Sequence, residues 1–276
     1  MNKGTLFIVS TPIGNLSDIT YRAVEVLKSV DAIAAEDTRH TLKLLNNLGI
    51  KQKLISFHEY SDPNKARYLI ELLLEGNSLA LVTDAGTPLI SDPGSPLIAL
   101  AYENNITVTA VPGACAAITA LTLSGMSCDR FTFEGFIPRD SSRKQVIERV
   151  KNCDCTCILY ESPHQLSKTL TELFRECGDR NIAICKELTK IHESVERTTL
   201  SQASEKYADV QVKGEYVLIL EGVKPKKPEI SDDDIIAALK QCLENGETKK
   251  TAVKAVSQEH EVPKNRVYQL MLNMDV

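Results

Sequence analysis

Four loops could carry chemistry, and each follows an expected strand. Three of them combine glycine or proline with small residues, namely STPIGN (10–15), TDAGTPLISDPG (83–94) and VPGACAA (111–117), and the fourth is the charged loop EDTR (36–39). Glycine and small side chains let a ligand lie against backbone N–H and C=O groups. In open α/β sheets, ligands gather beyond the carboxyl ends of the strands. Together the loops predict a small-ligand site, although any one of them alone is typical of a plain turn.

The glycine pattern does not support the common phosphate-binding loops. The chain has no GxxxxGKS/T segment and no GxGxxG after its first expected strand. Those motifs cradle the phosphates of nucleotides and dinucleotides. A P-loop or a dinucleotide Rossmann site is therefore not expected.

Strand and helix patterns alternate through the first 125 residues. Short apolar runs, typical of strands buried on both faces, occupy 5–10, 31–36, 53–57, 78–83 and 107–111. Helical spacing occupies 20–30, 41–48, 63–75, 96–104 and 113–123. This alternation predicts a mainly parallel sheet with helices on both faces.

Strand patterns are denser in the next hundred residues. Expected strands lie at 130–136, 155–161, 181–188, 193–200 and 216–221, and expected helices at 141–151, 163–177 and 201–209. A proline- and charge-rich linker is expected at 223–234, followed by amphipathic helices at 232–244, 249–259 and 264–272. The prediction is an α/β fold with an N-terminal domain (1–125), a second α/β domain with a mixed sheet (126–223) and a helical C-terminal appendage (231–276).

The charge balance restricts the partners. A formal net charge of -5 argues against indiscriminate nucleic-acid binding, which rests on phosphate neutralisation. Segment 231–276 has six Lys or Arg against eight Asp or Glu, so DNA is not an expected partner. No apolar run is long enough to span a membrane, so no membrane association is expected.

One stretch, 139–151, is the candidate for a local RNA-binding patch. Its cations are Arg139, Arg143, Lys144, Arg149 and Lys151. The alternative is a solvated helix face.

The eight cysteines include no CxxC pair. Cys153, Cys155 and Cys157 alternate, so on a strand they would share one face. A zinc site wants ligands brought together by tight turns, so no metal site is expected. Reduced thiols serving as small hydrophobic residues in a cytosolic protein are the favoured interpretation.

Seven segments then carry a resemblance. They are STPIGNLSDITYRA, AAEDTRHT, LVTDAGTPLISDPG, VPGACAA, SGMSCDRFTFEGFIPR, YESPH and KELTKIHE, in this order. Together they resemble the bacterial cytidine 2′-O-methyltransferases of small-subunit ribosomal RNA, within the tetrapyrrole (corrin/porphyrin) methylase superfamily. The resemblance runs from about Gly4 to Glu221. Thr83 stands where serine is usual, and Gln165 stands where an arginine commonly follows the histidine.

The resemblance implies a cytoplasmic S-adenosylmethionine-dependent enzyme that methylates a cytidine of 16S rRNA and is usually a homodimer. Its substrate would be free 16S rRNA or the small ribosomal subunit. It implies a two-domain tetrapyrrole-methylase-like fold with S-adenosylmethionine in the cleft. The implied cofactor contacts are Pro12, then Asp84, Ala85, Gly86 and Leu89 at the methionine end, and Cys115, Ala116, Glu161 and Leu188 near the adenosine.

Transfer to a ribose oxygen would benefit from a general base. The candidates are Glu36, Asp37, Glu161, His164, Lys186 and Glu187. Glu36 and Asp37 could instead form a structural ion pair and cap beside Arg39, and His164 could cap or pack near a helix start. If Lys186 and Glu187 are adjacent on a strand, only one of them can enter the cleft.

Aromatic residues could hold a flipped nucleotide at the cleft mouth. Phe133, Phe136 and Tyr160 are the candidates, with Arg139, although residues such as Phe131 and Phe133 in an apolar strand more often belong to the core. The C-terminal helices could grip rRNA or pad a dimer.

Two other functions remain open. One is a methyltransferase acting on a tetrapyrrole or corrin precursor, which the STPIGN loop disfavours because such enzymes usually carry GxGPGD there. The other is a non-catalytic ribosome-binding protein, which the full set of cofactor motifs disfavours.

Overall fold

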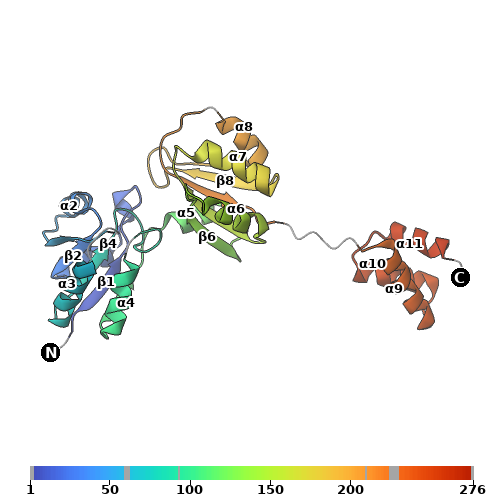
Figure 1. Ribbon diagram of the computed structural model, residues 1–276, viewed down its shortest axis with the longest axis horizontal. Helices are drawn as coiled ribbons and strands as arrows, with labels where there is room; N and C mark the ends of the chain where they lie inside the picture. The colour runs from blue at the N-terminus through green and yellow to red at the C-terminus, as the bar shows by residue number, and fades with distance from the viewer. Residues whose placement is uncertain (1–2, 59–62, 93, 209, 224–229, 275–276) are drawn as a thin grey trace. The chain divides into compact units, whose positions relative to one another are not determined.

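The computed structural model describes residues 3–58, 63–92, 94–208, 210–223 and 230–274. The chain forms two compact units, Met1–Val223 and Lys224–Val276, and each is described by itself (Figure 1). The expected linker falls partly outside the described residues, and residues 232–234 already belong to a helix. The finer division of the first unit at residue 125 stays a prediction.

The first sheet is parallel throughout, as the alternating pattern predicted. Its strands are β1 (Thr5–Val9), β2 (Ala32–Ala35), β3 (Leu54–Ser56), β4 (Leu79–Val82) and β5 (Thr107–Val111), in the order β3-β2-β4-β1-β5. Because β2 and β4 are buried along their whole length, they read as unbroken apolar runs.

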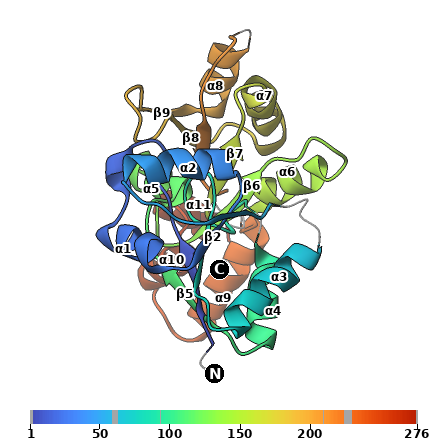
Figure 2. The same cartoon turned by 90° about the vertical axis from the view of Figure 1, so that its left-hand side faces the viewer.

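Helices cover both faces of this sheet. They are η1 (Leu16–Asp18), α1 (Tyr21–Ser29), α2 (Thr38–Asn47), α3 (Pro63–Leu74) and α4 (Ser95–Glu103). Leu69 of α3 and Leu97 of α4 pack with Ala34 on one face, whereas Leu27 of α1 and Leu45 of α2 belong to the cluster on the other. Figure 2 shows α3 and α4 on one side of β2 and α1 on the other.

The second sheet is mixed, as expected. Its strands are β6 (Phe131–Phe136), β7 (Thr156–Glu161), β8 (Asn181–Lys186), β9 (Ser194–Thr199) and β10 (Tyr216–Leu220), in the order β6-β7-β10-β8-β9. Among the described strand pairs of this second sheet, only β6–β7 is parallel. Helices α6 (Arg143–Asn152), α7 (Leu166–Cys177) and α8 (Leu200–Tyr207) share a core with one face.

Helix α5 (Ala116–Ser124) covers the other face of the second sheet, although it follows the last strand of the first. Ala117, Ala120 and Leu121 of α5 pack with Ile158 of β7 and Ile219 of β10. The chain thus passes from the first sheet to the second through the VPGACAA loop.

The second unit is a three-helix cluster of α9 (Asp232–Glu244), α10 (Lys249–Glu259) and α11 (Lys264–Asn273). Ser231 and Thr248 cap α9 and α10 with their hydroxyls, and Ile235, Val256 and Met271 are buried between the helices. No helix in the described parts of the chain has the length and apolarity needed to cross a membrane.

Several expected boundaries are wrong in ways that matter for function. Strand β8 ends at Lys186, and Glu187 has a φ of 52°, so these two residues are not neighbours on a strand. Helix α5 begins at Ala116 rather than Gly113, which leaves the glycine in a loop. Helix α2 begins at Thr38, three residues earlier than expected, because Asp37 caps it.

The three alternating cysteines do not lie on one strand, so the condition under which they would share a face is not met. Strand β7 begins at Thr156, so only Cys157 lies in it. Cys153 is the C-cap residue of α6, and the chain turns before Cys155. The strand expected at 155–161 therefore begins one residue later, because Cys155 still belongs to the turn after α6.

Candidate active site

A cavity of about 310 Å³ lies at the carboxyl ends of the first sheet's strands. The loops after β1, β2, β4 and β5 supply part of its wall, as expected for an open α/β sheet. Its lining residues are Ile13, Glu36, Thr83, Asp84, Ala85, Gly86, Thr87, Ile90, Ser91, Asp92, Cys115, Ala116, Phe136, Tyr160, Leu188 and Glu215. The last four come from the second sheet and its loops, so both sheets build the cavity.

The cavity wall is acidic. It carries the carboxylates of Glu36, Asp84, Asp92 and Glu215, and none of the described residues that line it is a lysine, arginine or histidine. The Glu215 carboxylate is, however, paired with Lys190 at 2.9 Å. Burial raises the pKa of Asp84, and the charge of Glu36 adds to this, although a hydrogen bond from the Asp37 backbone opposes it. Burial, with the charge of Glu36, raises the pKa of Asp92 to about 6. Such a wall attracts a cationic ligand and offers carboxylates able to take up a proton.

Hydrogen bonds tie the loops after β2 and β4 together. Thr83 Oγ1 donates to Glu36 Oε2 at 2.7 Å, and the Asp37 N–H donates to Asp84 Oδ1 at 3.1 Å. These loops lie side by side because β2 and β4 are paired in register. The acidic groups are therefore held by their neighbours and are not free to swing.

The 83–94 loop is folded tightly against the sheet. Gly86 exchanges backbone hydrogen bonds of 2.8 and 3.1 Å with Thr11. Leu89 and Ser91 have φ values of 76° and 68°, a conformation that costs non-glycine residues on the order of 1–3 kcal/mol each. Gly94 has a φ of 137°, and a Cβ there would lie 2.7 Å from Leu89 Cδ2. This folding brings Asp92 back into the cavity.

Most of the cofactor contacts inferred from the resemblance line the cavity. These are Asp84, Ala85, Gly86, Cys115, Ala116 and Leu188. Pro12 and Leu89 are not among the lining residues, although their neighbours Ile13 and Ile90 are. The Leu89 side chain instead lies close to Gly94.

Glu161 lies outside the cavity lining, and its side chain is buried. Thr169 Oγ1 donates to Glu161 Oε2 at 2.5 Å, and the Ser162 N–H donates to Oε1 at 2.7 Å. Arg143 donates to the same threonine hydroxyl at 3.0 Å. Glu161 thus belongs to a hydrogen-bond network that joins α6, β7 and α7.

The candidate bases occupy different places. Glu36 lines the cavity, whereas Asp37 caps α2 through the Arg39 N–H and pairs with the Arg39 side chain at 2.6 Å. Hydrogen bonds from Arg39 hold the pKa of Asp37 far below its usual range. His164 is exposed in the turn before α7.

The other two candidates interact with their own surroundings. The Lys186 ammonium lies 5.9 Å from the ring centre of Tyr216. Glu187 accepts a hydrogen bond of 3.0 Å from Lys190 and one of 2.9 Å from the Glu215 N–H. The Lys190 hydrogen bond, opposed in part by burial, lowers the pKa of Glu187.

Sequence reasoning missed two carboxylates of the site. Asp92 lies in the same loop as Asp84, and the repetition of an acid within one glycine-rich loop was the available signal. Glu215 precedes β10, and no motif marked it.

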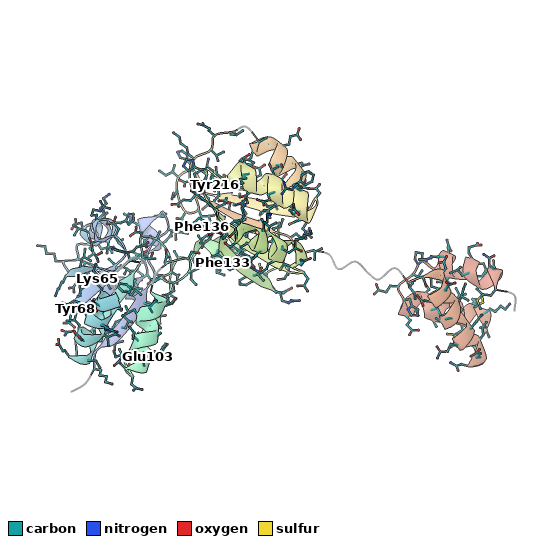
Figure 3. The ribbon with its side chains drawn as sticks, viewed as in Figure 1. Lys65, Tyr68, Glu103, Phe133, Phe136 and Tyr216 are labelled. Carbon is teal, nitrogen blue, oxygen red and sulfur yellow. The ribbon has the colours of Figure 1, made fainter. Side chains whose placement is uncertain are left out.

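Aromatic side chains stand at one wall of the cavity. Phe136 and Tyr160 line it, and the Tyr160 ring meets Phe133 and Phe136 edge-on at centroid distances of 5.0 and 5.4 Å. Phe136 is 56% exposed, and Figure 3 labels it with Phe133. Phe133 packs against the buried cluster that includes Ile158. The interpretation of Phe131 as a core residue is wrong, because Phe131 is 42% exposed. Arg139 is exposed and does not line the cavity.

The candidate RNA-binding stretch, 139–151, contains some cations that are paired within the protein and others that are exposed. Arg143 is buried and pairs with Glu172 at 2.6 Å. Arg149 pairs with Glu134 at 2.7 Å, and Lys151 lies 3.8 Å from Glu148. These three cations are engaged within the protein, so Arg139 and Lys144 are the better placed to meet a partner.

Residues 5–204 match the family described as Tetrapyrrole (Corrin/Porphyrin) Methylases. The chain belongs to the tetrapyrrole methylase family. As a member, it is a methyltransferase, and its methyl donor is S-adenosylmethionine.

Relatives that span nearly the whole chain share one name, "Ribosomal RNA small subunit methyltransferase I". The protein of Halalkalibacterium halodurans is 43% identical over 98% of this chain and 95% of its own. That of Synechocystis is 42% identical over 99% of both, and that of Haemophilus influenzae 44% identical over 98% and 96%.

Solved structures of tetrapyrrole methylases share the fold. A diphthine synthase has a TM-score of 0.61 at 15% identity, covering 79% of this chain and 89% of its own. The methyltransferase CobJ has a TM-score of 0.60 at 17% identity, covering 80% and 95%. The predicted fold class is confirmed.

Proposed function

We propose that this methyltransferase transfers a methyl group to the 2′-oxygen of a cytidine in 16S ribosomal RNA. The observation that carries the proposal is the near-full-length similarity, at 42–44% identity, to three proteins named for small-subunit ribosomal RNA. The solved enzymes that act on tetrapyrroles are only 17% identical, so their likeness bears on the fold alone.

The acidic cavity is the proposed donor site. When bound, S-adenosylmethionine supplies a methyl group activated by a positively charged sulfur. Its sulfonium and amino groups suit a wall that bears Glu36, Asp84, Asp92 and Glu215. The backbone of the 83–94 loop and the small side chains of Cys115 and Ala116 leave room for the nucleoside, and Leu188 offers it an apolar contact. A volume of about 310 Å³ falls within the range of small-molecule sites.

Asp92 is the proposed proton acceptor for the ribose hydroxyl. It lines the cavity, and burial raises its pKa to about 6. A base with a pKa close to the working pH is ionised yet still basic enough to take a proton. Asp37, His164, Lys186 and Glu187 do not line the cavity. Glu36 does line it, and its hydrogen bond with Thr83 suits a role in orientation.

Phe136 and Tyr160 are proposed to hold the target nucleotide. Bases drawn out of an RNA fold are often stacked on aromatic rings. Phe136 is exposed at the cavity wall, and Tyr160 Oη accepts a hydrogen bond of 3.1 Å from the Ala117 N–H, which fixes its ring. The target RNA could then extend toward Arg139 and Lys144.

The enzyme is further proposed to act in the cytoplasm, where ribosomal subunits are its substrate, and to work as a homodimer. These two points rest on the resemblance of the motifs.

The test is methyl transfer from labelled S-adenosylmethionine to small ribosomal subunits purified from a strain that lacks this gene. Wild-type subunits and a porphyrinogen are the controls. The expected result is label in the RNA of the deficient subunits alone, with resistance to alkaline cleavage at one nucleotide. Label in the porphyrinogen, or in a base instead of a ribose, would refute the proposal.

A further inference from the structure

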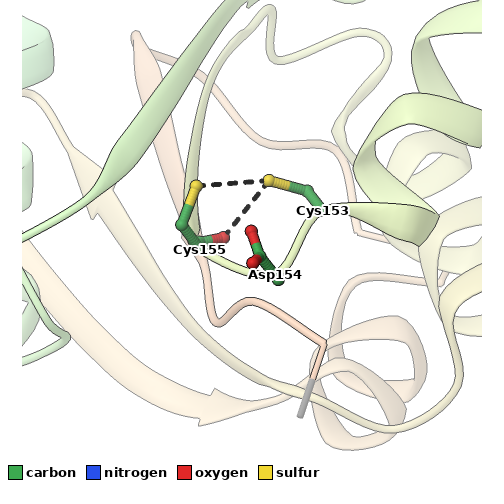
Figure 4. Close-up of side chains that lie close together, drawn as sticks. All are labelled: Cys153, Asp154 and Cys155. Atoms are coloured by element: carbon green, nitrogen blue, oxygen red, sulfur yellow. Dashed lines mark hydrogen bonds between the residues drawn. The ribbon is translucent and has the colours of Figure 1, made fainter. Parts of the chain in front are cut away.

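The turn between α6 and β7 gathers two thiols and a carboxylate. The ligand atoms of Cys153, Asp154 and Cys155 all lie within 4.8 Å of one another, and the two sulfurs are 3.4 Å apart (Figure 4). The cluster precedes β7, whereas Tyr160, near the other end of that strand, borders the cavity. From Thr156 to Tyr160 the strand advances about 13 Å, so the cluster lies away from the cavity.

We propose that this turn binds a thiophilic divalent cation of the zinc class, through the Cys153 and Cys155 thiolates and the Asp154 carboxylate. Zinc lies about 2.3 Å from thiolate sulfur and about 2.0–2.2 Å from carboxylate oxygen, in a tetrahedral arrangement. Two sulfurs on one such ion are then about 3.8 Å apart, so a separation of 3.4 Å has to open only slightly. Water completes the fourth position.

Both negative and positive groups surround the turn. Cys153 is the C-cap residue of α6, where the helix dipole is negative, but the Arg180 guanidinium already donates a hydrogen bond of 3.1 Å to the Val150 carbonyl at that helix end. Asp154 pairs with Arg130 at 3.2 Å, but both side chains are largely exposed. Such surface pairs are weak, so the carboxylate can exchange the guanidinium for a metal ion at little cost. Arg130 then remains close enough to offset the negative charge of the three ligands.

The turn is held in place before any ion binds. The Val223 N–H donates a hydrogen bond of 2.7 Å to the Cys153 carbonyl. Gly222 passes so close that a Cβ there would lie 2.5 Å from the Asp154 carbonyl carbon. The turn is therefore clamped between α6, β7 and the residues that follow β10. A site with fixed ligands loses less entropy on binding.

Cys153 and Cys155 are both free cysteines. Binding deprotonates both thiols and releases their protons to solvent, so affinity rises with pH.

The test titrates the full-length, reduced, metal-free protein with Zn²⁺ against a chromophoric chelator, and repeats it with Co²⁺ to detect sulfur ligation. We expect one equivalent per chain and a thiolate-to-cobalt absorption band. Cys153→Ser and Cys155→Ser should each abolish that band. Asp154→Asn, an exposed and nearly isosteric change, should weaken binding about tenfold or more while keeping the fold. Cys128→Ser alters an exposed cysteine outside the cluster and should bind as the unaltered protein does.

Two further readouts separate the site from a folding defect. Zn²⁺ should raise the melting temperature of the unaltered protein and of Cys128→Ser, and should protect two thiols from alkylation. Methyl transfer should be the same with and without Zn²⁺. Less than one equivalent bound, or equal binding by the Cys153→Ser/Cys155→Ser double variant, would overturn the proposal. Closure of a Cys153–Cys155 disulfide without metal uptake after reduction would do so too.

Discussion

The hydroxyl of Thr83 donates a hydrogen bond of 2.7 Å to a carboxylate oxygen of Glu36. The two residues follow β4 and β2, which are paired in the first sheet. The Asp84 N–H approaches the same oxygen at 3.5 Å. One acidic group of the cavity is therefore oriented by the neighbouring strand end, and the cavity wall is preorganised before a ligand enters.

Thr83→Val tests this orientation. Valine keeps the shape but leaves the Glu36 oxygen without its donor, which should cost about 1–3 kcal/mol of stability and weaken S-adenosylmethionine binding. Thr83→Ser keeps the hydroxyl and should bind the donor nearly as the unaltered protein does. Urea unfolding and calorimetric titration measure the two effects. Equal behaviour of the valine and serine variants would show that the hydrogen bond does not orient the site.

Asp92→Asn should raise the stability of the protein and lower its rate of methyl transfer. The amide is close in shape and carries no charge, so it removes the cost of a buried carboxylate beside Glu36. If Asp92 is the proton acceptor, the rate of methyl transfer should fall by roughly 10²–10⁴-fold. The melting temperature at neutral pH should rise. Steady-state kinetics and thermal unfolding provide the measurements, and an unchanged rate would exclude Asp92 as the base.

The raised pKa of Asp92 should make both the stability and the rate of the unaltered enzyme depend on pH. Its pKa in the folded protein is about 6, against 3.8 in the absence of the fold, so the folded state holds this proton more tightly. The contribution of Asp92 to stability therefore declines as pH rises from about 4 to about 6, and stays low above that. The rate should show the opposite trend, falling below about pH 6 as the base becomes protonated. Comparing both pH profiles with those of Asp92→Asn isolates this one group.

Arg143→Ala should destabilise the fold without affecting RNA binding. Arg143 is buried, pairs with Glu172 at 2.6 Å and supports Thr169 at 3.0 Å. Removing one partner of a buried pair costs about 3–5 kcal/mol. Lys144→Ala, at an exposed neighbouring position, should change stability by no more than about 0.5 kcal/mol. Urea unfolding distinguishes them. If the lysine variant proves the more destabilised, the buried network is not the main support of α6.

Phe136→Ala should weaken the use of RNA more than the binding of the methyl donor. An exposed ring that stacks on a base contributes about 1–3 kcal/mol, so the KM for small subunits should rise by roughly tenfold or more. The dissociation constant of S-adenosylmethionine should change much less. Phe131→Ala is the matched control, because Phe131 is also an exposed aromatic of β6 but does not line the cavity. Equal effects of the two substitutions on KM would argue against a stacking role for Phe136.

The elements of this fold were largely readable from local patterns. Strands β2 and β4 are buried throughout and so appear as apolar runs, and Gly49 and Gly76, with φ values of 66° and 99°, mark the ends of α2 and α3. The 83–94 loop could be expected near a ligand site because it follows a buried strand, whereas Asp84 and Gly86 were singled out in it only by the resemblance of the motifs. The predicted ends of helices and strands were less accurate than their positions. The start of α2 at the Asp37 cap and the end of β8 before Glu187 depend on contacts that a local pattern does not contain.

By itself, then, the sequence determined the alternating α/β class, the mixed second sheet, the C-terminal helices and the loops that meet at the cavity. These follow from periodicity and turn chemistry, which act over a few residues. Only the tertiary structure decided that Asp92 returns to the cavity, that Glu161 is held away from it by Thr169, and that Cys153 and Cys155 face each other across a turn. The physical reason is that strand order, loop backbone and side-chain burial are set by packing between segments far apart in the chain, and no local pattern records that packing.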